Sequence, residues 1–395
     1  MPTRSMLFTA SLAIALMVVV VSPGANSGQH AGTPVVENPR SSSAQQQPQN
    51  FAKTAILRDE LGQNFVVGIP GPIFDEKTES FLSHVRPGGI VLYYRNVKSR
   101  EQLRILISDL QSFALKTTGH PYFIMIDEEP GAVTRLGLFE KVRASANLDW
   151  HAVERDVSVL ESEGINVELA PLADFSFNRQ SFLRKRVPAD SIPELLRFNR
   201  RFIVLLHKHG ISATLKHFPG MGIFEVDSHK QLPVGNIDAP KLESSLNIFR
   251  DGIKSGAGLV MTGHALYGNL DPDNPATISP KIIGGMLRQR LGFRGLVITD
   301  DLSQMALARS DKMTIEEATI AAAKAGNNLL MFSHNFPKTE QVFDAVLQRA
   351  EQDQGLRQAV EQNSRTITEF KRRTVNPPSA RQLARVVASE SASIK

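Results

Sequence analysis

Residues 216–229 have the sequence KHFPGMGIFEVDSH and follow the short apolar run Ile211–Leu215. The run predicts a buried strand, so a lysine and a histidine emerge together where that strand ends. The glycine-rich loop closes with Asp227 and His229, which an extended backbone would point to the same side. A carboxylate bonded to one imidazole nitrogen raises the basicity of the other nitrogen. The pair is a candidate general acid/base, although Asp-Ser-His alone would indicate an ordinary solvated loop.

A second strand runs into paired carboxylates. Residues 295–302 have the sequence GLVITDDL, in which an apolar, β-branched run ends at Asp300 and Asp301. A carboxylate at the end of a buried strand can act as a nucleophile toward the anomeric carbon of a sugar. Aspartate is also a favoured residue at a helix N-terminus. We therefore expect one of the two to be catalytic and the other to cap the next helix.

Together these stretches resemble the family 3 glycoside hydrolases, and within them the NagZ-type β-N-acetylglucosaminidases. The family string is Lys-His-Phe-Pro-Gly-His-Gly, four variable residues and Asp-Ser-His. Residues 216–229 match this string except at Met221, where the family usually has histidine. The resemblance spans about residues 55–335 and includes, in the family's order, the segments 87–96, 126–135, 260–264, 275–279 and 299–301.

The resemblance implies retaining hydrolysis of a terminal β-linked N-acetylglucosamine through a covalent glycosyl-enzyme intermediate. Asp300 would be the nucleophile and Asp301 a helix cap. His229 would protonate the leaving oxygen and later activate water, with Asp227 orienting it. Most glycosidases use two carboxylates instead. A neutral imidazole base, however, avoids bringing a second anion toward an anionic nucleophile.

The resemblance also implies a set of substrate-binding residues. Asp127 and Arg135 are spaced like the family's sugar-binding aspartate and arginine, and Lys216 and His217 belong to the main motif. Arg186 lies 30 residues before Lys216, at the family spacing for another sugar-contacting arginine. A solvated basic loop is an almost equally good interpretation of Arg186, because it follows other basic residues.

The chain departs from the family pattern at four positions. They are Pro130, Ala132, Met221 and Asn328, which stand where the family usually has glycine, arginine, histidine and aspartate. None of them removes the candidate dyad or nucleophile. We expect them to affect substrate preference and loop geometry more than the reaction itself.

The order of apolar runs predicts a single (β/α)8 TIM-type barrel, because strands alternate with amphipathic stretches such as the helix Ile192–His209. Asp127, Lys216 and Asp300 stand at the carboxyl ends of strands, where this fold places its active sites. Since 95 residues follow Asp300 and must complete the barrel, we expect no second C-terminal α/β domain. The expected strands are Asn64–Ile69, Gly89–Tyr93, Tyr122–Asp127, Asn166–Leu169, Ser212–His217, Gly258–Thr262, Gly295–Thr299 and Asn327–Phe332.

Composition narrows the chemistry further. The 395 residues carry a formal net charge of +5 and contain no cysteine, which excludes disulfides, thiolate catalysis and cysteine-ligated metals. Basic residues form no long run and do not alternate with aromatic ones, which argues against nucleic acid as a partner. No metal constellation is evident, and we expect no cofactor. The expected partner is a carbohydrate substrate, with no stable protein partner, so we expect a monomer.

The N-terminus predicts export. Arg4 precedes the apolar run Met6–Val21, and Ala25 and Ser27 occupy positions −3 and −1 of a cut after Ser27. The run is short for a membrane span, which needs about 20 residues. We therefore expect a periplasmic or secreted protein, with an uncleaved membrane anchor as the alternative. The expected organisation is a signal peptide at 1–27, a disordered linker at 28–50, the barrel at 51–375 and a polar C-terminal tail at 376–395.

These observations predict an exported exo-β-N-acetylglucosaminidase that acts on peptidoglycan fragments (muropeptides) or on related oligosaccharides such as those from chitin. One alternative is another family 3 glycosidase, such as a β-glucosidase, which the Asp-Ser-His loop disfavours. A second alternative is a non-catalytic sugar-binding barrel. The retention of Asp227, His229 and Asp300 argues against it.

Overall fold

The computed structural model describes residues 41–131, 133–139, 141–145, 147–305 and 313–375. The expected signal peptide, the first part of the expected linker, Ala132 and the expected C-terminal tail lie outside these ranges. From Gln49 onward the described residues form one compact unit. Helix α1 (Ser41–Asn64) begins inside the segment for which the composition predicts a linker.

Eight strands form a single parallel sheet in the order β10-β1-β2-β3-β4-β5-β7-β9. A parallel bridge between Ile298 and Leu329 joins the two outer strands, so the sheet closes into a barrel. Seven strands lie within the expected ranges, and β5 extends one residue beyond its range to Phe218. The strands are β1 (Phe65–Val67), β2 (Gly89–Leu92), β3 (Phe123–Ile126), β4 (Val167–Glu168), β5 (Ser212–Phe218), β7 (Leu259–Thr262), β9 (Leu296–Thr299) and β10 (Leu330–Phe332).

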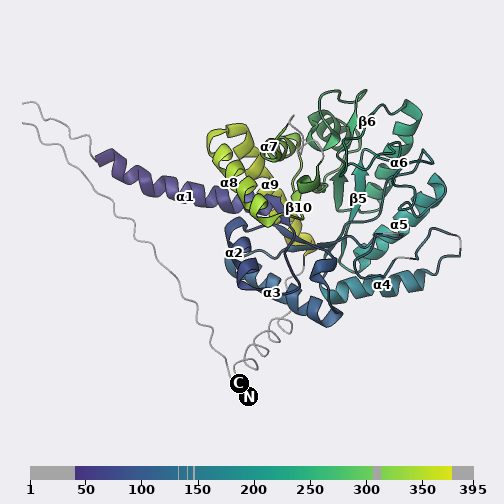
Figure 1. Cartoon of the computed structure of the whole chain (residues 1–395), viewed down its shortest axis with the longest axis horizontal. Coiled ribbons are helices and arrows are strands. Elements are labelled where there is room, and N and C mark those ends of the chain that lie inside the picture. Colours follow the sequence, from purple (N-terminus) through teal and green to yellow (C-terminus); the bar gives the residue numbers. More distant parts are fainter. Residues whose placement is uncertain (1–40, 132, 140, 146, 306–312, 376–395) are drawn as a thin grey trace, which may run out of the picture. The chain divides into compact units, whose positions relative to one another are not determined.

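Helices surround the barrel, which confirms the (β/α)8 architecture (Figure 1). Helix α5 (Ile192–Lys208) matches the clearest predicted connector. It begins after Ser191, whose side chain accepts a hydrogen bond from the Glu194 backbone, and it has a proline in its first turn. The other helices are α2 (Glu76–Val85), α3 (Arg100–Thr118), α4 (Trp150–Glu163), α6 (Ala239–Lys254), α7 (Ile315–Ala325), α8 (Phe336–Gln352) and α9 (Gln354–Thr374).

Several short elements lie in the connections between the barrel strands. Strands β6 (Val234–Gly235) and β8 (Leu266–Tyr267) pair in parallel as a separate small sheet. A π-helix, η3 (Lys281–Arg290), connects β7 to β9. In the part of the chain that the structure describes, the 3-10 turns are η1 (Tyr94–Asn96), η2 (Ala276–Ile278) and η4 (Leu302–Gln304).

The core has two layers because side chains alternate along each strand. In β3, Ile124 and Ile126 pack in the layer between strands and helices, whereas Phe123 and Met125 belong to the cluster inside the barrel. Helix α9 contributes Ile367 to that inner cluster. Its Phe370 ring lies against Phe123, with 6.0 Å between ring centroids. The amino ends of the strands are thus closed by apolar packing, and the polar groups gather at the carboxyl ends.

Candidate active site

Asp300 follows β9 directly and lies at the carboxyl end of the barrel. Its Oδ2 atom is 3.4 Å from Nε2 of His229 and 3.9 Å from Nε2 of His217. Burial alone would raise the pKa of this carboxyl, but the neighbouring histidines, His229 above all, hold it well below its usual value. Asp300 is therefore an ionised, largely buried carboxylate, the state that a nucleophile needs.

Asp301 points elsewhere and caps the next turn, as the sequence predicts for one of the pair. Its carboxylate accepts hydrogen bonds from the backbone N–H of Ser303 at 3.0 Å and from Gln304 Nε2 at 2.8 Å. It also accepts from the backbone N–H of Ser333, just after β10, at 3.2 Å. Asp301 therefore ties the loop after β9 to the end of β10.

His229 lies between two carboxylates. Its Nδ1 atom is 3.4 Å from Oδ1 of Asp227, and its Nε2 atom faces Asp300. The His229 backbone N–H also donates to Asp227 Oδ1 at 3.0 Å, which fixes the turn. The Asp300 charge is the main cause that raises the pKa of His229 to about 9, and Asp227 adds to it against the opposing effect of burial. The imidazole is thus protonated at neutral pH.

Lys216 joins two carboxylates in the floor of the site. Its ammonium group is 2.7 Å from Asp127 Oδ1 and 2.6 Å from Glu129 Oε1. Glu129 in turn binds the Arg186 guanidinium through two hydrogen bonds, of 2.6 and 3.1 Å. Burial opposes ionisation of Glu129, but Arg186 and Lys216 lower its pKa to about 2. Arg186 therefore belongs to a charged network and not to a solvated basic loop.

Arg135 comes to the site on a loop held by a buried carboxylate. Its Nη2 atom is 3.3 Å from Asp127 Oδ2, and its guanidinium lies 5.0 Å from the ring centroid of Tyr93. The Glu128 carboxylate accepts from the backbone N–H groups of Arg135, Leu136 and Leu138 at 2.5, 2.7 and 2.7 Å. The Thr134 hydroxyl donates to it as well. Glu128 therefore organises the loop that presents Arg135.

His217 is oriented by Asp174. Oδ2 of Asp174 accepts from the His217 backbone N–H at 3.0 Å and lies 2.7 Å from its Nδ1. Its Oδ1 atom accepts from the backbone N–H of Met221 at 2.6 Å. Asp174 thus sets the direction in which His217 Nε2 points, toward Asp300.

The structure brings the sequence-predicted site residues into two adjoining groups. Asp227, His229, Asp300 and His217 form one, and the network around Lys216 forms the other. Sequence reasoning missed Glu128, Glu129 and Asp174 as members. Glu128 and Glu129 directly follow the predicted strand end at Asp127, a position that could have identified them. Asp174 has no such signal, because it lies five residues beyond the predicted strand.

The four departures from the family pattern lie at different depths. Met221 is buried beside Gly263, where an added Cβ atom would be 2.5 Å from the methionine sulfur. Asn328 precedes β10 at the opposite end of the barrel and binds Arg288 and Asn363 at 2.9 and 2.8 Å. It therefore supports the barrel floor and not the substrate. Pro130 is buried beside the network, and Ala132 lies outside the described residues.

A cavity of about 610 Å³ opens beside the candidate acid/base. Its lining includes His229, Asp227 and Arg186, together with Phe182 and Gln231. Within the described ranges, no group of three or more histidine, cysteine or carboxylate residues is placed to hold a metal ion. The arrangement offers an ionised carboxylate as candidate nucleophile, a protonated imidazole as candidate acid and charged groups of the kind that bind hydroxyls, which suits acid-assisted displacement at an anomeric carbon.

Comparisons with known proteins identify a family and several relatives of this chain. Residues 56–369 match the family described as Glycosyl hydrolase family 3 N terminal domain. The chain is 28% identical over 334 residues to a β-hexosaminidase of Idiomarina loihiensis, covering 78% of this chain and 96% of that protein. A β-hexosaminidase of Psychromonas ingrahamii is 31% identical over 253 residues, which is 60% of this chain and 73% of the relative.

Two solved structures are similar over most of the chain. One is a glycoside hydrolase family 3 β-N-acetylglucosaminidase from a Paenibacillus species, with a TM-score of 0.72 and 26% identity. The match covers 84% of this chain and 67% of the other. The second is a β-N-acetylhexosaminidase from Beutenbergia cavernae, with a TM-score of 0.72 and 25% identity, covering 80% and 98% of the two chains.

Proposed function

The chain belongs to glycosyl hydrolase family 3, and on this premise we propose that it removes terminal β-linked N-acetylglucosamine with retention of configuration. It is a glycoside hydrolase. The relatives named β-hexosaminidase and the β-N-acetylglucosaminidase structures support the choice of sugar. One observation carries the mechanism: the protonated His229 ring lies between Asp227 and the candidate nucleophile Asp300.

In the first step, an Asp300 oxygen attacks the anomeric carbon and forms a glycosyl ester. The bond from that carbon to the leaving oxygen breaks, and this oxygen takes the proton from His229 Nε2. The high pKa of His229 keeps the proton in place at neutral pH until the leaving oxygen needs it. Asp227 holds the ring through Nδ1 and balances its charge.

The second step reverses the role of His229. The ester has removed the Asp300 charge, which is the main cause of the raised pKa, so the pKa of His229 falls and the ring becomes a base. His229 Nε2 then takes a proton from water while the water oxygen attacks the anomeric carbon. The ester bond breaks and the Asp300 carboxylate is restored. Formation of the intermediate itself thus converts the acid into a base.

The sugar-binding groups are proposed from the second group of residues. Asp127 and Arg135 each keep about 15% of their side chains exposed, whereas Glu129 and Lys216 are almost fully buried. Asp127, Arg135 and Arg186, whose side chain is 22% exposed and lines the cavity beside His229, are therefore the groups best placed to contact sugar hydroxyls. Lys216 holds Asp127 in place through an ion pair, and Glu129 pairs with both Lys216 and Arg186.

We propose peptidoglycan fragments as the natural substrate and export as the site of action. The N-terminal apolar run supports export, and an exported hexosaminidase meets the cell wall first. Among residues that the structure describes, no helix has the length and apolar character to cross a bilayer.

Trapping the intermediate tests the assignment. A slow fluorinated N-acetylglucosamine analogue should label Asp300, and mass spectrometry of the peptide should show no label on the matched control, Asp301. Asp300→Asn should lower kcat by roughly 10⁴-fold without loss of fold, as removal of a covalent nucleophile does. Faster hydrolysis of a chromogenic glucoside than of the N-acetylglucosaminide would favour a β-glucosidase. No turnover of either would favour a non-catalytic sugar-binding barrel.

A further inference from the structure

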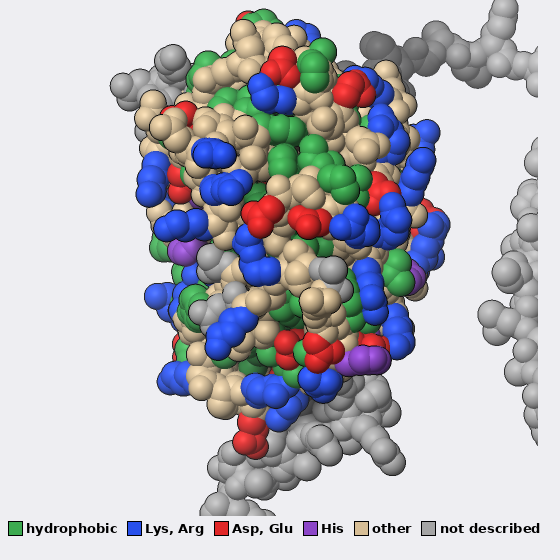
Figure 2. All heavy atoms as spheres, turned by 90° about the vertical axis from the view of Figure 1, so that its right-hand side faces the viewer, with side chains coloured by type: hydrophobic (Ala, Val, Ile, Leu, Met, Phe, Trp, Pro, Cys, Tyr) green, Lys and Arg blue, Asp and Glu red, His purple; other side chains and the backbone are tan. Residues whose placement is uncertain are grey.

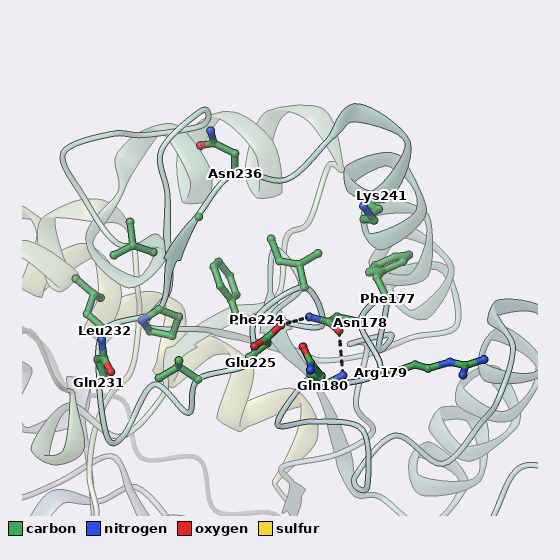
Figure 3. A pocket seen from close by; sticks show the side chains of 15 residues that line it. Phe177, Asn178, Arg179, Gln180, Phe224, Glu225, Gln231, Leu232, Asn236 and Lys241 are labelled. Atoms are coloured by element: carbon green, nitrogen blue, oxygen red, sulfur yellow. Dashed lines mark hydrogen bonds between the residues drawn. The ribbon is translucent and has the colours of Figure 1, made fainter.

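A second hollow lies beyond the acid/base. Its volume is about 1020 Å³, and it is lined by residues 177–180, 223–226 and 231–236 and by Lys241 on α6 (Figure 3). Three residues, Glu225, Val226 and Gln231, line both this hollow and the cavity that contains His229. The two spaces therefore adjoin one another at these residues.

The proposed mechanism indicates which part of the substrate would face the hollow. His229 protonates the leaving oxygen, so the part of the substrate attached to that oxygen must extend past His229. The sugar that is cleaved off lies instead toward Asp127 and Arg135. A leaving group longer than one sugar unit would pass from the first cavity into the second hollow.

The lining of the hollow is amide and apolar in character. Phe177, Phe224 and Val234 supply apolar surface, and the Val234 side chain is 64% exposed. Figure 2 shows hydrophobic side chains gathered on this face at the height of β6 and α6 in Figure 1. Asn178 and Gln180 add amide groups, which can both donate to and accept from hydroxyls.

Three charged side chains of the described residues line the hollow, namely Arg179, Glu225 and Lys241. Glu225 and Lys241 have polar partners within the protein, and Arg179 points away. Asn178 donates to Glu225 at 2.7 Å, and its own oxygen accepts from the Gln180 backbone at 2.9 Å. Lys241 pairs with Asp238 at 2.5 Å. The Arg179 side chain extends away from the other lining residues (Figure 3). Among the described lining residues, Glu225 and Lys241 are thus engaged and Arg179 points away, so no charge is directed into the hollow to favour an ionic ligand.

We propose that this hollow is a leaving-group subsite for a further uncharged sugar unit. The inference rests on the proposed function. A pyranose ring has apolar faces that pack on aromatic and aliphatic side chains, and its hydroxyls match the amides. The subsite would make the enzyme prefer oligosaccharides of three or more units over disaccharides. Binding energy from such remote units can accelerate the reaction at the cleaved bond.

The test compares N-acetylglucosamine oligomers of two, three and four β-linked units. We expect kcat/KM to rise by about tenfold from two units to the longer oligomers, because only these reach the hollow. Val234→Trp should fill the hollow and remove the rise, while a chromogenic N-acetylglucosaminide is cleaved as before. Val204→Trp is the matched control, since Val204 is 55% exposed on α5. Gln180→Ala provides a second, milder variant that should reduce the rise.

The outcomes separate the subsite from the proposed function. Absence of a length dependence, with good cleavage of the chromogenic substrate, would overturn the subsite alone. An unchanged rise in both Val234→Trp and Gln180→Ala would also overturn it. Failure to cleave every N-acetylglucosaminide would overturn the proposed function instead.

Discussion

His229 differs from an ordinary surface histidine because each of its two ring nitrogens faces a carboxylate. The Asp300 charge contributes most to its raised pKa, so the protonation of His229 depends on whether Asp300 is free or esterified. This dependence links proton transfer to covalent chemistry within 3.4 Å. In the proposed mechanism, it also allows a residue whose usual pKa is near 6.5 to act as an acid at neutral pH.

The coupling predicts the pH profile. The acid must be protonated in the free enzyme, so kcat/KM should fall as pH rises through the His229 pKa of about 9. The Asp300 pKa lies well below its usual value, so the nucleophile stays ionised across the neutral range. Stopped assays on an N-acetylglucosamine oligomer from pH 5 to 10 would measure this alkaline limb of the kcat/KM profile.

Asp227→Asn is the informative variant for this profile, because it removes one of the charges that raise the His229 pKa. In this variant, the alkaline limb of the kcat/KM profile should move to lower pH. The control is His207→Gln at an exposed position, which should leave the limb in place. A limb near pH 6.5 in the wild-type enzyme would contradict the proposed charge coupling.

Among the loops, the one after β3 shows how a buried carboxylate can position a residue that we propose binds the substrate. Glu128 accepts from four donors within residues 134–138 and is fully buried. Hydrogen bonds to a charged group contribute about 1.5–3 kcal/mol each, so the loop depends on this one side chain. Arg135, at its centre, is held close to Asp127.

Glu128→Gln should therefore weaken substrate binding more than chemistry. The amide replaces an acceptor with a donor that faces backbone N–H groups, so Arg135 should lose its fixed position. We expect KM to rise by about tenfold with kcat changed less than threefold, as loss of uniform binding predicts. Steady-state kinetics would measure both, with the exposed Glu101→Gln on α3 as the control. A fall in kcat at constant KM would contradict the positioning role.

Helix α9 closes the opposite end of the barrel, and we expect it to contribute to stability and not to chemistry. Ile367 is fully buried in the inner cluster, and truncation to alanine should cost about 2–5 kcal/mol of unfolding free energy. Urea unfolding would measure this loss. Ile105→Ala, at a position 56% exposed on α3, should cost less than about 0.5 kcal/mol. Near-normal kcat/KM in folded Ile367→Ala is expected, and a specific loss of kcat would contradict this division between ends.

Sequence patterns predicted the strands and the Asp227–His229 pair because both depend on short-range order. The strand ranges follow from continuous apolar runs, and the pair lies within one loop. The Glu129–Arg186 and Asp174–His217 contacts join residues 57 and 43 positions apart. Only closure of the barrel brings them together, and no local pattern marks Asp174. The sequence could not decide between the two interpretations of Arg186 either, because its partner Glu129 lies in the loop that follows a different strand.

On the scale of the whole molecule, the barrel separates stability from chemistry. One end is closed by α9, and the other presents Asp127, Lys216 and Asp300 from three different strands. The face that includes α5 and α6 shows basic side chains interspersed with acidic ones (Figure 2). The mixed charges on this face form no continuous basic track of the kind that binds nucleic acid, and the net charge of +5 is modest.

All proposed catalytic groups lie on the barrel, so the N-terminal segment should determine location and not activity. We expect cleavage after about Ser27 and a mature protein in the periplasm or the medium. Ile14→Arg interrupts the apolar run Met6–Val21 and should keep the chain in the cytosol with unchanged kcat/KM. Ser42→Arg, outside that run, is the control. Fractionation of the native host, with N-terminal sequencing, would measure both.

The N-terminus and the cell fraction together distinguish the possible locations. A chain that begins near Gly28 outside the cytoplasm supports cleavage and places the enzyme where it meets the cell wall. An intact Met1 in the membrane fraction would favour an uncleaved anchor, since the apolar run would then remain with the protein. An intact chain in the cytosol would contradict export. The substrate would then have to be fragments imported into the cell, because the assembled wall lies beyond the membrane.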